Sequence, residues 1–240
     1  MPLTPTRVLL HPPKRYALYS RGEEDLVVVP MSQSLRFTTE LTLEFWMYFP
    51  QDMGGDYDRS VEVVGALYDY WVRYNQFYDP NLWELIIYDT EDTQRILGNL
   101  RINLTAGWYQ IAVTWKSGVG GAFYLNGVNR AGLSSASYIM RQTASNFVVR
   151  WRYVPCYFAM VRAYDRLLSD REMRYNFENP MSPITNGLRL WLKMEEGSGT
   201  TVYDYSGYGN HGTIYNATWA EITKTPVRTL SPVRVLSPVR

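Results

Sequence analysis

The sequence has a single cysteine, Cys156, and two histidines, His11 and His211. One cysteine excludes an internal disulfide and a zinc site made of cysteines, and few side chains are left to titrate near neutral pH. No run approaches the roughly 18 apolar residues of a membrane helix, and the first residues lack the apolar core of a signal peptide. We therefore expect no membrane insertion. The expected location is an extracellular surface or a virion, and without a signal peptide this requires an unusual secretion route or a virion released by lysis.

An excess of charge of one sign is also lacking, because 24 basic residues stand against 23 acidic ones. Such a chain has no electric field that draws nucleic acid over a distance, so no nucleic-acid partner is expected. Lysine is scarce, and most of the basic residues are arginine, whose guanidinium suits bidentate and stacked contacts at interfaces. This usage favours a homo-oligomer or polymer.

Tyrosine and tryptophan are abundant, and turn signals recur at short intervals. Residues 41–49, LTLEFWMYF, alternate with period two, which predicts a strand with one solvent-exposed face. Residues 83–89, 108–115 and 156–164 are apolar on both faces or nearly so, as in the central strands of a sheet that is covered on both sides. The pattern predicts an all-β fold, a two-layer antiparallel β-sandwich.

Two local motifs are specific. Asn126-Gly127 lies between two β-rich runs, and both residues tolerate the positive φ angles of a type I′ hairpin turn. Ser169, with Glu172 three positions later, forms a capping box. It predicts one short helix that ends before Pro180.

Three stretches resemble a known family. The first is YALYSRGEEDLVVVPMSQSLRFTTELTLEFWMYF, the second WYQIAVTWKSGVGGAFYLNGV and the third FAMVRAYDRLLSDREM. They resemble the opening strands, the central hairpin, and the closing strand and helix of concanavalin A-like, laminin G-like (pentraxin-type) domains. The resemblance covers roughly residues 16–219 and implies a jelly-roll sandwich, but this fold hosts lectins, hydrolases, adhesion modules and structural subunits alike.

A fourth matching stretch is out of place. In this family GLRLWLKMEEGSGTTVYDYSGYGNHGTIYNATW normally precedes the segment that begins YALYS, whereas here it comes last. Residues 188–219 either fold back beside the chain's own N-terminal strand, or complete the sandwich of the next subunit, or begin a truncated second repeat. The second alternative would use an open sheet edge to build a polymer.

The expected organisation is an N-terminal extension (1–15), one laminin G-like sandwich (16–222) and a proline-rich tail (223–240). Within the sandwich, residues 50–60 and 73–83 are expected to be surface loops. The tail repeats a hexad, TPVRTL SPVRVL SPVR, and the extension carries the related TPTRVL. Both ends are compatible with an edge strand or a polyproline conformation, and we expect them to join subunits. The candidate assembly residues are Pro5, Arg7, Leu9, Pro226, Arg228, Leu230, Pro232, Arg234, Leu236 and Pro238.

Catalytic patterns are absent. Hydrolases that share this sandwich carry Glu-x-Asp-x-Glu on one strand, which points all three carboxylates into one cleft. The acidic residues within 22–26 and 88–92 do not match it and read as solvated turns. His211 lies near Asp204 and Ser206 in sequence, but in a glycine-rich turn without a nucleophile elbow. We expect no enzyme activity and no cofactor.

Two clusters of residues are candidate binding sites. Asp52, Asp56 and Asp58 share a glycine-rich loop and form the best calcium candidate, although aspartate and glycine are also ordinary turn residues. Aromatic faces beside polar side chains are typical of sugar sites. The candidate glycan-binding residues are Tyr70, Trp71, Arg73, Tyr74, Asn75, Tyr78 and Trp83, for which the alternative reading is core or subunit contact.

The sequence therefore predicts a non-enzymatic structural subunit that self-assembles into an extracellular filament, fibre or virion component. The alternative is a carbohydrate-binding or adhesion module that acts as a monomer. A divergent glycosidase is a third, more distant reading.

Overall fold

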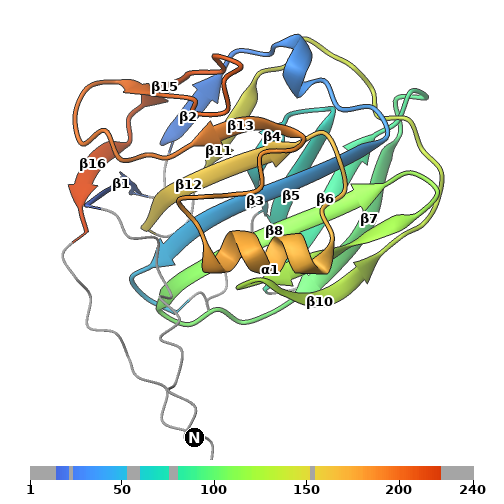
Figure 1. Cartoon of the computed structure of the whole chain (residues 1–240), viewed down its shortest axis with the longest axis horizontal. Helices are drawn as coiled ribbons and strands as arrows, with labels where there is room; N and C mark the ends of the chain where they lie inside the picture. The colour runs from blue at the N-terminus through green and yellow to red at the C-terminus, as the bar shows by residue number, and fades with distance from the viewer. Residues whose placement is uncertain (1–14, 22–23, 53–59, 76–80, 152–154, 223–240) are drawn as a thin grey trace, which may run out of the picture.

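The computed structural model describes the chain over residues 15–21, 24–52, 60–75, 81–151 and 155–222. These residues form two antiparallel sheets packed face to face, with one helix on the outside of one sheet (Figure 1). The predicted two-layer sandwich with one short helix is confirmed. Among the described residues, no helix is long and apolar enough to cross a membrane.

The front sheet is the one that carries the helix, α1 (Asp170–Glu178). Its strand β12 pairs with β3 on one side, and on the other side with β1 along one half and β13 along the other half. In spatial order the strands are β10 (Val128–Leu133), β9 (Gly120–Leu125), β8 (Gly107–Lys116), β3 (Glu40–Phe49), β12 (Cys156–Tyr164), β1 (Tyr16–Ser20) and β16 (Thr218–Glu221), with β13 (Leu188–Leu192) beside β12.

The back sheet contains the other eight strands. In spatial order they are β14 (Thr201–Val202), β15 (Gly212–Tyr215), β2 (Leu26–Val29), β11 (Phe147–Arg150), β4 (Ser60–Ala66), β5 (Tyr70–Asn75), β6 (Leu82–Tyr88) and β7 (Gln94–Arg101). A short 3-10 helix, η1 (Gln33–Leu35), connects β2 of the back sheet to β3 of the front sheet. Part of the segment predicted as a loop, residues 73–83, is therefore the end of β5 and the start of β6.

The inward-facing side chains of the two sheets meet in one large apolar core. Alternate residues of each strand enter it, as the period of two requires. Its largest aromatic members include Phe45, Trp83, Trp115, Phe123, Phe147 and Trp151, all of which are fully buried.

The Asn126-Gly127 turn and the helix start are as predicted. Asn126 and Gly127 have φ angles of 51° and 72° and join β9 to β10. The Ser169 hydroxyl accepts a hydrogen bond from the Glu172 amide while the Glu172 side chain accepts one from the Ser169 amide, so the capping box is formed. Hydrogen bonds from Arg166 lower the pKa of Glu172 to about 2, so this carboxylate stays charged at the helix N-terminus.

The solvent-exposed face predicted for β3 is wrong. Thr42, Glu44 and Trp46 alternate outward as expected, but all three are buried. The reason is α1, which lies over this face: Phe177 stacks on Trp46, with ring centroids 5.4 Å apart and ring planes 8° apart. A sheet face covered by an amphipathic helix is as dry as the core between the sheets.

A buried ion pair lies under the helix. The Arg162 Nη1 donates to the Glu44 Oε1 at 2.8 Å, and neither side chain has any exposed surface. Gln110 Nε2 donates to the same Glu44 oxygen at 2.8 Å, and Asn176 Nδ2 donates to the other at 3.0 Å. Arg162 also donates to the carbonyl of Pro180. One carboxylate thus joins β3, β8, β12 and α1.

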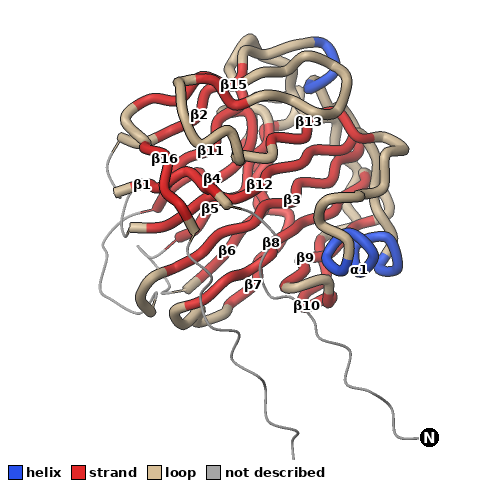
Figure 2. The backbone as a smooth tube through the Cα atoms, turned by 60° about the vertical axis from the view of Figure 1, so that its left-hand side comes forward, coloured by secondary structure: helices blue, strands red, loops and turns tan. Residues whose placement is uncertain are grey.

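Residues 188–219 complete the sandwich of their own chain. The strand β13 pairs with β12, β15 pairs with β2, and β16 pairs with β1 (Figure 2). Of the three sequence-based alternatives, the structure has the first: the late segment folds back beside the N-terminal strand. Neither exchange with a neighbour nor a second repeat is needed to account for it.

Candidate functional site

A pocket of about 570 Å³ opens at the end of the sandwich where β3 begins and β12 ends. One wall follows η1 and leads into β3, and the other comes from β13 and the glycine-rich turn after β14. The lining residues are Gln33, Ser34, Arg36, Phe37, Thr38, Thr39, Glu40, Asp165, Arg189 and Tyr208. The pocket therefore needs the early and the late parts of the chain together.

The pocket wall that contains η1 is held in place by hydrogen bonds and by ring packing. Leu35 is fully buried, and its carbonyl accepts a hydrogen bond from the Tyr70 hydroxyl at 2.6 Å. The ring of Phe37 packs on that of Tyr70 with centroids 5.0 Å apart, and the Phe37 carbonyl accepts a hydrogen bond from Gln142 at 2.6 Å. The backbone that carries Arg36 is thus held on both sides.

The opposite wall is organised by Asp204. One carboxylate oxygen accepts hydrogen bonds from the amides of Trp191 and Ser206, each at 2.9 Å, and the other accepts from the Asn210 amide at 2.9 Å. Gly207 and Gly209 have φ angles of 94° and 71°, which only glycine adopts readily. The turn that carries Tyr208 is therefore built on one buried carboxylate.

Asn210 ties the two walls together. Its amide nitrogen donates to the carbonyl of Arg189 at 2.8 Å and to the Ser34 hydroxyl at 2.9 Å. Its amide oxygen accepts a hydrogen bond from Ser32 at 2.7 Å. Because Asn210 is buried, these bonds are shielded from water and hold the pocket in one shape.

The charged side chains of the pocket differ in whether they form a hydrogen bond or an ion pair with another described residue. Asp165 accepts a hydrogen bond from the Arg189 Nε at 2.7 Å, and Glu40 accepts one from the Leu167 amide at 3.3 Å while also pairing with Lys116. Arg36 makes no side-chain hydrogen bond or ion pair within the described part of the chain. Burial raises the pKa of Asp69, and the charge of Arg36 is one of the weaker effects that oppose this rise.

Tyr208 supplies an aromatic surface. Its side chain is 49% exposed, and the Arg189 guanidinium lies 4.8 Å from the ring centroid. This places an exposed ring, a guanidinium and the Asp165 carboxylate side by side. Such a combination stacks against a flat apolar face and hydrogen-bonds to the hydroxyl groups around it.

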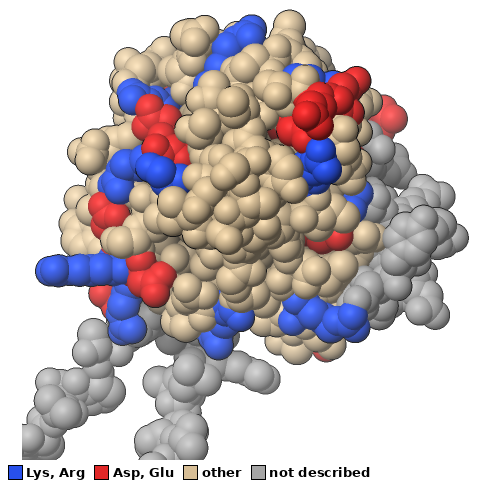
Figure 3. Space-filling model, turned by 90° about the vertical axis from the view of Figure 1, so that its right-hand side faces the viewer, with Lys and Arg blue, Asp and Glu red and all other residues tan. Residues whose placement is uncertain are grey.

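Charges of both signs are mixed at the surface. Figure 3 shows basic and acidic side chains in adjacent groups around an uncharged centre. A face of this kind attracts no polyanion at long range.

Hydrogen bonds connect Ser206 and His211 to Asp204, but they do not form a catalytic relay. His211 Nδ1 accepts a hydrogen bond from the Asp204 backbone amide at 2.9 Å. The Ser206 hydroxyl donates to the Asp204 carboxylate at 2.7 Å and to no histidine nitrogen. The carboxylate thus orients the serine, and the histidine is left at the surface beside Tyr203.

The aromatic cluster predicted for glycan binding is split by strand alternation. Tyr70, Tyr74 and Trp83 point into the core and are buried, with Tyr74 and Trp83 ring centroids 4.9 Å apart. The sugar-stacking interpretation is wrong for these three, because no ring face reaches the surface.

The other members face outward on the back sheet. Trp71 is 5% exposed. Arg73 and Asn75 both donate to the Glu84 carboxylate, at 2.8 Å and 3.1 Å. Tyr78 lies outside the described residues. The cluster therefore does not form one exposed site.

Most of the calcium loop and both terminal segments lie outside the described residues. Asp52 accepts a hydrogen bond from the Ala106 amide at 2.8 Å, whereas Asp56 and Asp58 are not described. Elsewhere in the described part, no group of three or more His, Cys, Asp or Glu side chains is placed to hold a metal. The assembly residues of the tails, from Pro5 to Leu9 and from Pro226 to Pro238, are likewise not described, and these interpretations stay predictions.

Sequence reasoning missed Arg36, Arg189 and Tyr208. They are far apart in sequence, and only the pairing of the late strands with the early ones brings them together. One local signal was present: Tyr208 stands between two glycines, in a turn where a large aromatic side chain has no core to enter.

The observed fold is the one expected from the family whose model matches the sequence. The architecture is that of a two-layer jelly-roll domain, and the family model for the concanavalin A-like lectin/glucanases superfamily matches residues 21–174. This is well over half of the sequence, so the chain belongs to that superfamily. A comparison with curated proteins gives no match.

Solved structures show the same fold. A putative carbohydrate-binding protein from Bacteroides ovatus aligns with a TM-score of 0.65 at 16% identity, covering 88% of this chain and 62% of that one. The binding domain of Paraclostridial Mosquitocidal Protein 1 has a TM-score of 0.54 at 14% identity, covering 67% and 42%. The binding domain of botulinum neurotoxin serotype D has 0.55 at 10%, covering 68% and 42%. The chain spans less than two thirds of each of these structures, and at such identities the likeness shows the fold alone.

Proposed function

We propose that this chain is a non-catalytic carbohydrate-binding module, with its sugar site in the pocket between η1 and the glycine-rich turn. The observation that carries the proposal is Tyr208, an exposed ring on a rigid turn beside Arg189 and Asp165. A pyranose ring has one apolar face and a rim of hydroxyl groups. The tyrosine ring fits the face, and the charged groups with Thr38 and Thr39 fit the rim.

The family and the neighbours support binding over assembly. The neighbours are described as a putative carbohydrate-binding protein and as toxin binding domains. The assembly interpretation rested on the two terminal segments, which lie outside the described residues, and on a late segment free to enter a neighbour. That late segment pairs within its own chain. We keep an extracellular surface as the expected location, where glycans are abundant.

The ion pairs of the pocket carboxylates favour a site that binds a sugar without hydrolysing it. Glu40 pairs with Lys116 and Asp165 pairs with Arg189, so both carboxylates already have a cation beside them. We infer that these carboxylates accept hydroxyl hydrogen bonds and position the sugar.

The first prediction concerns Tyr208. In a glycan-array screen of the full chain, followed by titration with the best oligosaccharide, Tyr208→Ala is expected to weaken binding about tenfold, equivalent to ~1.4 kcal/mol. Arg36→Gln is expected to weaken it as well, because the Arg36 guanidinium lines the pocket and donates no hydrogen bond to any described residue.

Tyr215→Ala is the matched control, because Tyr215 is 50% exposed, lies on β15 of the same segment and does not line the pocket. Its affinity should equal that of the unmodified chain. Equal loss in Tyr208→Ala and Tyr215→Ala, or no glycan bound at all, would remove the proposal.

A further inference from the structure

Four aromatic side chains form a continuous row across the outer face of the front sheet. They come from adjacent strands and stand directly opposite one another: Tyr19 of β1 faces Tyr157 of β12, Tyr157 faces Tyr48 of β3, and Tyr48 faces Trp108 of β8. The successive ring centroids are 4.9, 5.7 and 5.3 Å apart. We call these four side chains the aromatic row.

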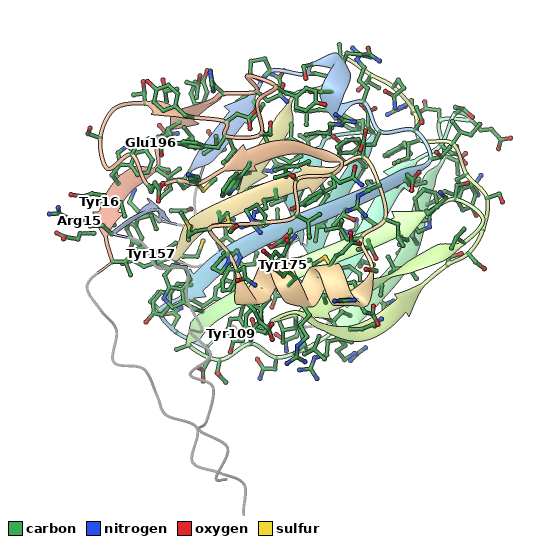
Figure 4. All side chains as sticks on the ribbon, viewed as in Figure 1. Arg15, Tyr16, Tyr109, Tyr157, Tyr175 and Glu196 are labelled. Carbon is green, nitrogen blue, oxygen red and sulfur yellow. The ribbon has the colours of Figure 1, made fainter. Side chains whose placement is uncertain are left out.

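The aromatic row lies beyond the part of the sheet that α1 covers. Trp46, two residues before Tyr48 on β3, is covered by Phe177 of the helix and is fully buried. Tyr19, Tyr48 and Tyr157 are only partly buried. Figure 4 shows Tyr157 on the sheet beside the helix, apart from Tyr175 on the helix itself. Three of the four rings therefore present surface to a further ligand.

The geometry of the aromatic row does not favour a sugar. Its successive ring planes are inclined by 41°, 64° and 44°, so the rings share no common plane on which a pyranose could stack. The outward neighbours toward the helix on β1, β3 and β12 are apolar, namely Ala17, Trp46 and Met160, and Gln110 on β8 already donates to Glu44. Inclined aromatic rings instead leave grooves between them, which accept proline rings and aliphatic side chains.

The chain carries a matching segment that begins close by. Residues 225–240, TPVRTLSPVRVLSPVR, place Pro226, Pro232 and Pro238 at intervals of six among valine and leucine. Ile222, the last described residue, donates its amide to the Arg15 carbonyl at 2.8 Å. Its side chain packs against the outer cluster that also contacts Tyr48 and Tyr157. The last described residue, three positions before the repeat begins, thus lies on the face that bears the aromatic row.

The length of one hexad also matches the width of the aromatic row. Four neighbouring strands span about 14 Å between the first and the last, at ~4.8 Å per spacing. One hexad in the polyproline conformation spans about 19 Å, at ~3.1 Å per residue. One hexad is thus long enough to cross the aromatic row, and two successive hexads offer the same site two equivalent ligands.

We propose that the aromatic row binds the proline-hexad segment, residues 225–240, of the same chain. The site is separate from the sugar pocket, and the proposal does not rest on sugar binding. Attachment at Ile222 makes the effective concentration of the segment high, so a weak contact is enough to keep it bound. The terminal repeat would then cover an apolar surface of its own domain.

Limited trypsin digestion of the full chain tests this. Trypsin cuts after Arg228 and Arg234 within the repeat, and mass spectrometry gives the rate at each bond. Each rate is divided by that of the corresponding free peptide. In the double variant Tyr48→Ser, Tyr157→Ser we expect cleavage about tenfold faster than in the unmodified chain, since cleavage follows the population of the released segment.

Tyr175→Ser is the matched control, because Tyr175 is 42% exposed on α1 and outside the aromatic row. Its tail should be cut at the unmodified rate. If the double variant fails to fold, the triple variant Pro226→Ala, Pro232→Ala, Pro238→Ala, which leaves the sandwich intact, is expected to show the same acceleration.

Three results would overturn the proposal. The first is a normalised rate near that of the free peptide in the unmodified chain. The second is protection that rises with protein concentration, which would assign the segment to a second copy. The third is protection of the bond after Arg7, in the related N-terminal TPTRVL, in place of the bonds after Arg228 and Arg234.

Discussion

Glu44→Gln is expected to lower the free energy of unfolding by about 3–5 kcal/mol, the cost of breaking a buried ion pair by removing one charge. The carboxylate accepts hydrogen bonds from Arg162, Gln110 and Asn176 under the helix. A neutral amide leaves the Arg162 guanidinium buried and uncompensated. It also replaces one accepting oxygen with an NH2 group, so that a donor faces the neighbouring donors. Urea unfolding followed by tryptophan fluorescence measures the loss.

The comparison is with Glu221→Gln. Glu221 also pairs with an arginine, Arg15, at 3.0 Å, but the two side chains are 54% and 72% exposed. Exposed pairs of this kind contribute at most about 1 kcal/mol. If the two variants lost similar stability, the network under α1 would not have the role we assign to it.

Trp83→Ala is expected to lower the free energy of unfolding by about 3–5 kcal/mol, because it opens a cavity among packed aromatic rings of the core. The Trp83 ring centroid lies 4.9 Å from that of Tyr74, 6.0 Å from Trp151 and 6.1 Å from Phe45. Affinity for the oligosaccharide, measured at a temperature where the variant is folded, should be unchanged. This separates a core role from a sugar-stacking role.

Trp83→Phe serves as the conservative control. It keeps an aromatic ring in the site and removes the indole N–H, which has no hydrogen-bond partner among the described residues. Its loss of stability should be clearly smaller than that of Trp83→Ala. Weakened sugar binding in Trp83→Phe with unchanged stability would return this residue to the binding site.

Much of the fold follows from local signals. The capping box at Ser169 and the turn at Asn126-Gly127 each depend on two residues close in sequence, and both form as expected. The strand over residues 156–164 is apolar on both faces, and it lies between β3 and the strands β1 and β13. Short-range chemistry and periodicity are enough for such features.

Other features depend on contacts that no local pattern contains. Alternation placed Glu44 and Trp46 correctly on the outer face of β3, but their burial depends on α1, more than a hundred residues later. The aromatic residues of β5 and β6 were grouped by composition, whereas a strand sends neighbours to opposite faces. Tyr74 and Trp71 thus could not share one site.

The candidate pocket also depends on contacts that no local sequence pattern contains. Arg36 and Tyr208 are separated by most of the chain, and Asn210 joins their two walls by bonds to Ser34 and to the Arg189 carbonyl. Only knowledge that residues 188–219 return to the N-terminal strands would have predicted this pairing. The sequence left that choice open among three alternatives.

The fold and the proposed sugar pocket both require that residues 188–219 belong to the same sandwich as β1 and β2. Thr213 of β15 stands directly opposite Val28 of β2, and both face outward. The double variant Thr213→Cys, Val28→Cys, oxidised and run on a non-reducing gel, tests this directly. Burial raises the pKa of the Cys156 thiol, which keeps it out of the exchange.

We predict a disulfide within one chain, seen as a species of monomer mass that migrates faster than its reduced form. Disulfide-linked dimers or longer ladders at low protein concentration would mean that β15 enters a neighbouring molecule. The pocket would then be built from two chains, and the self-completed sandwich would be contradicted.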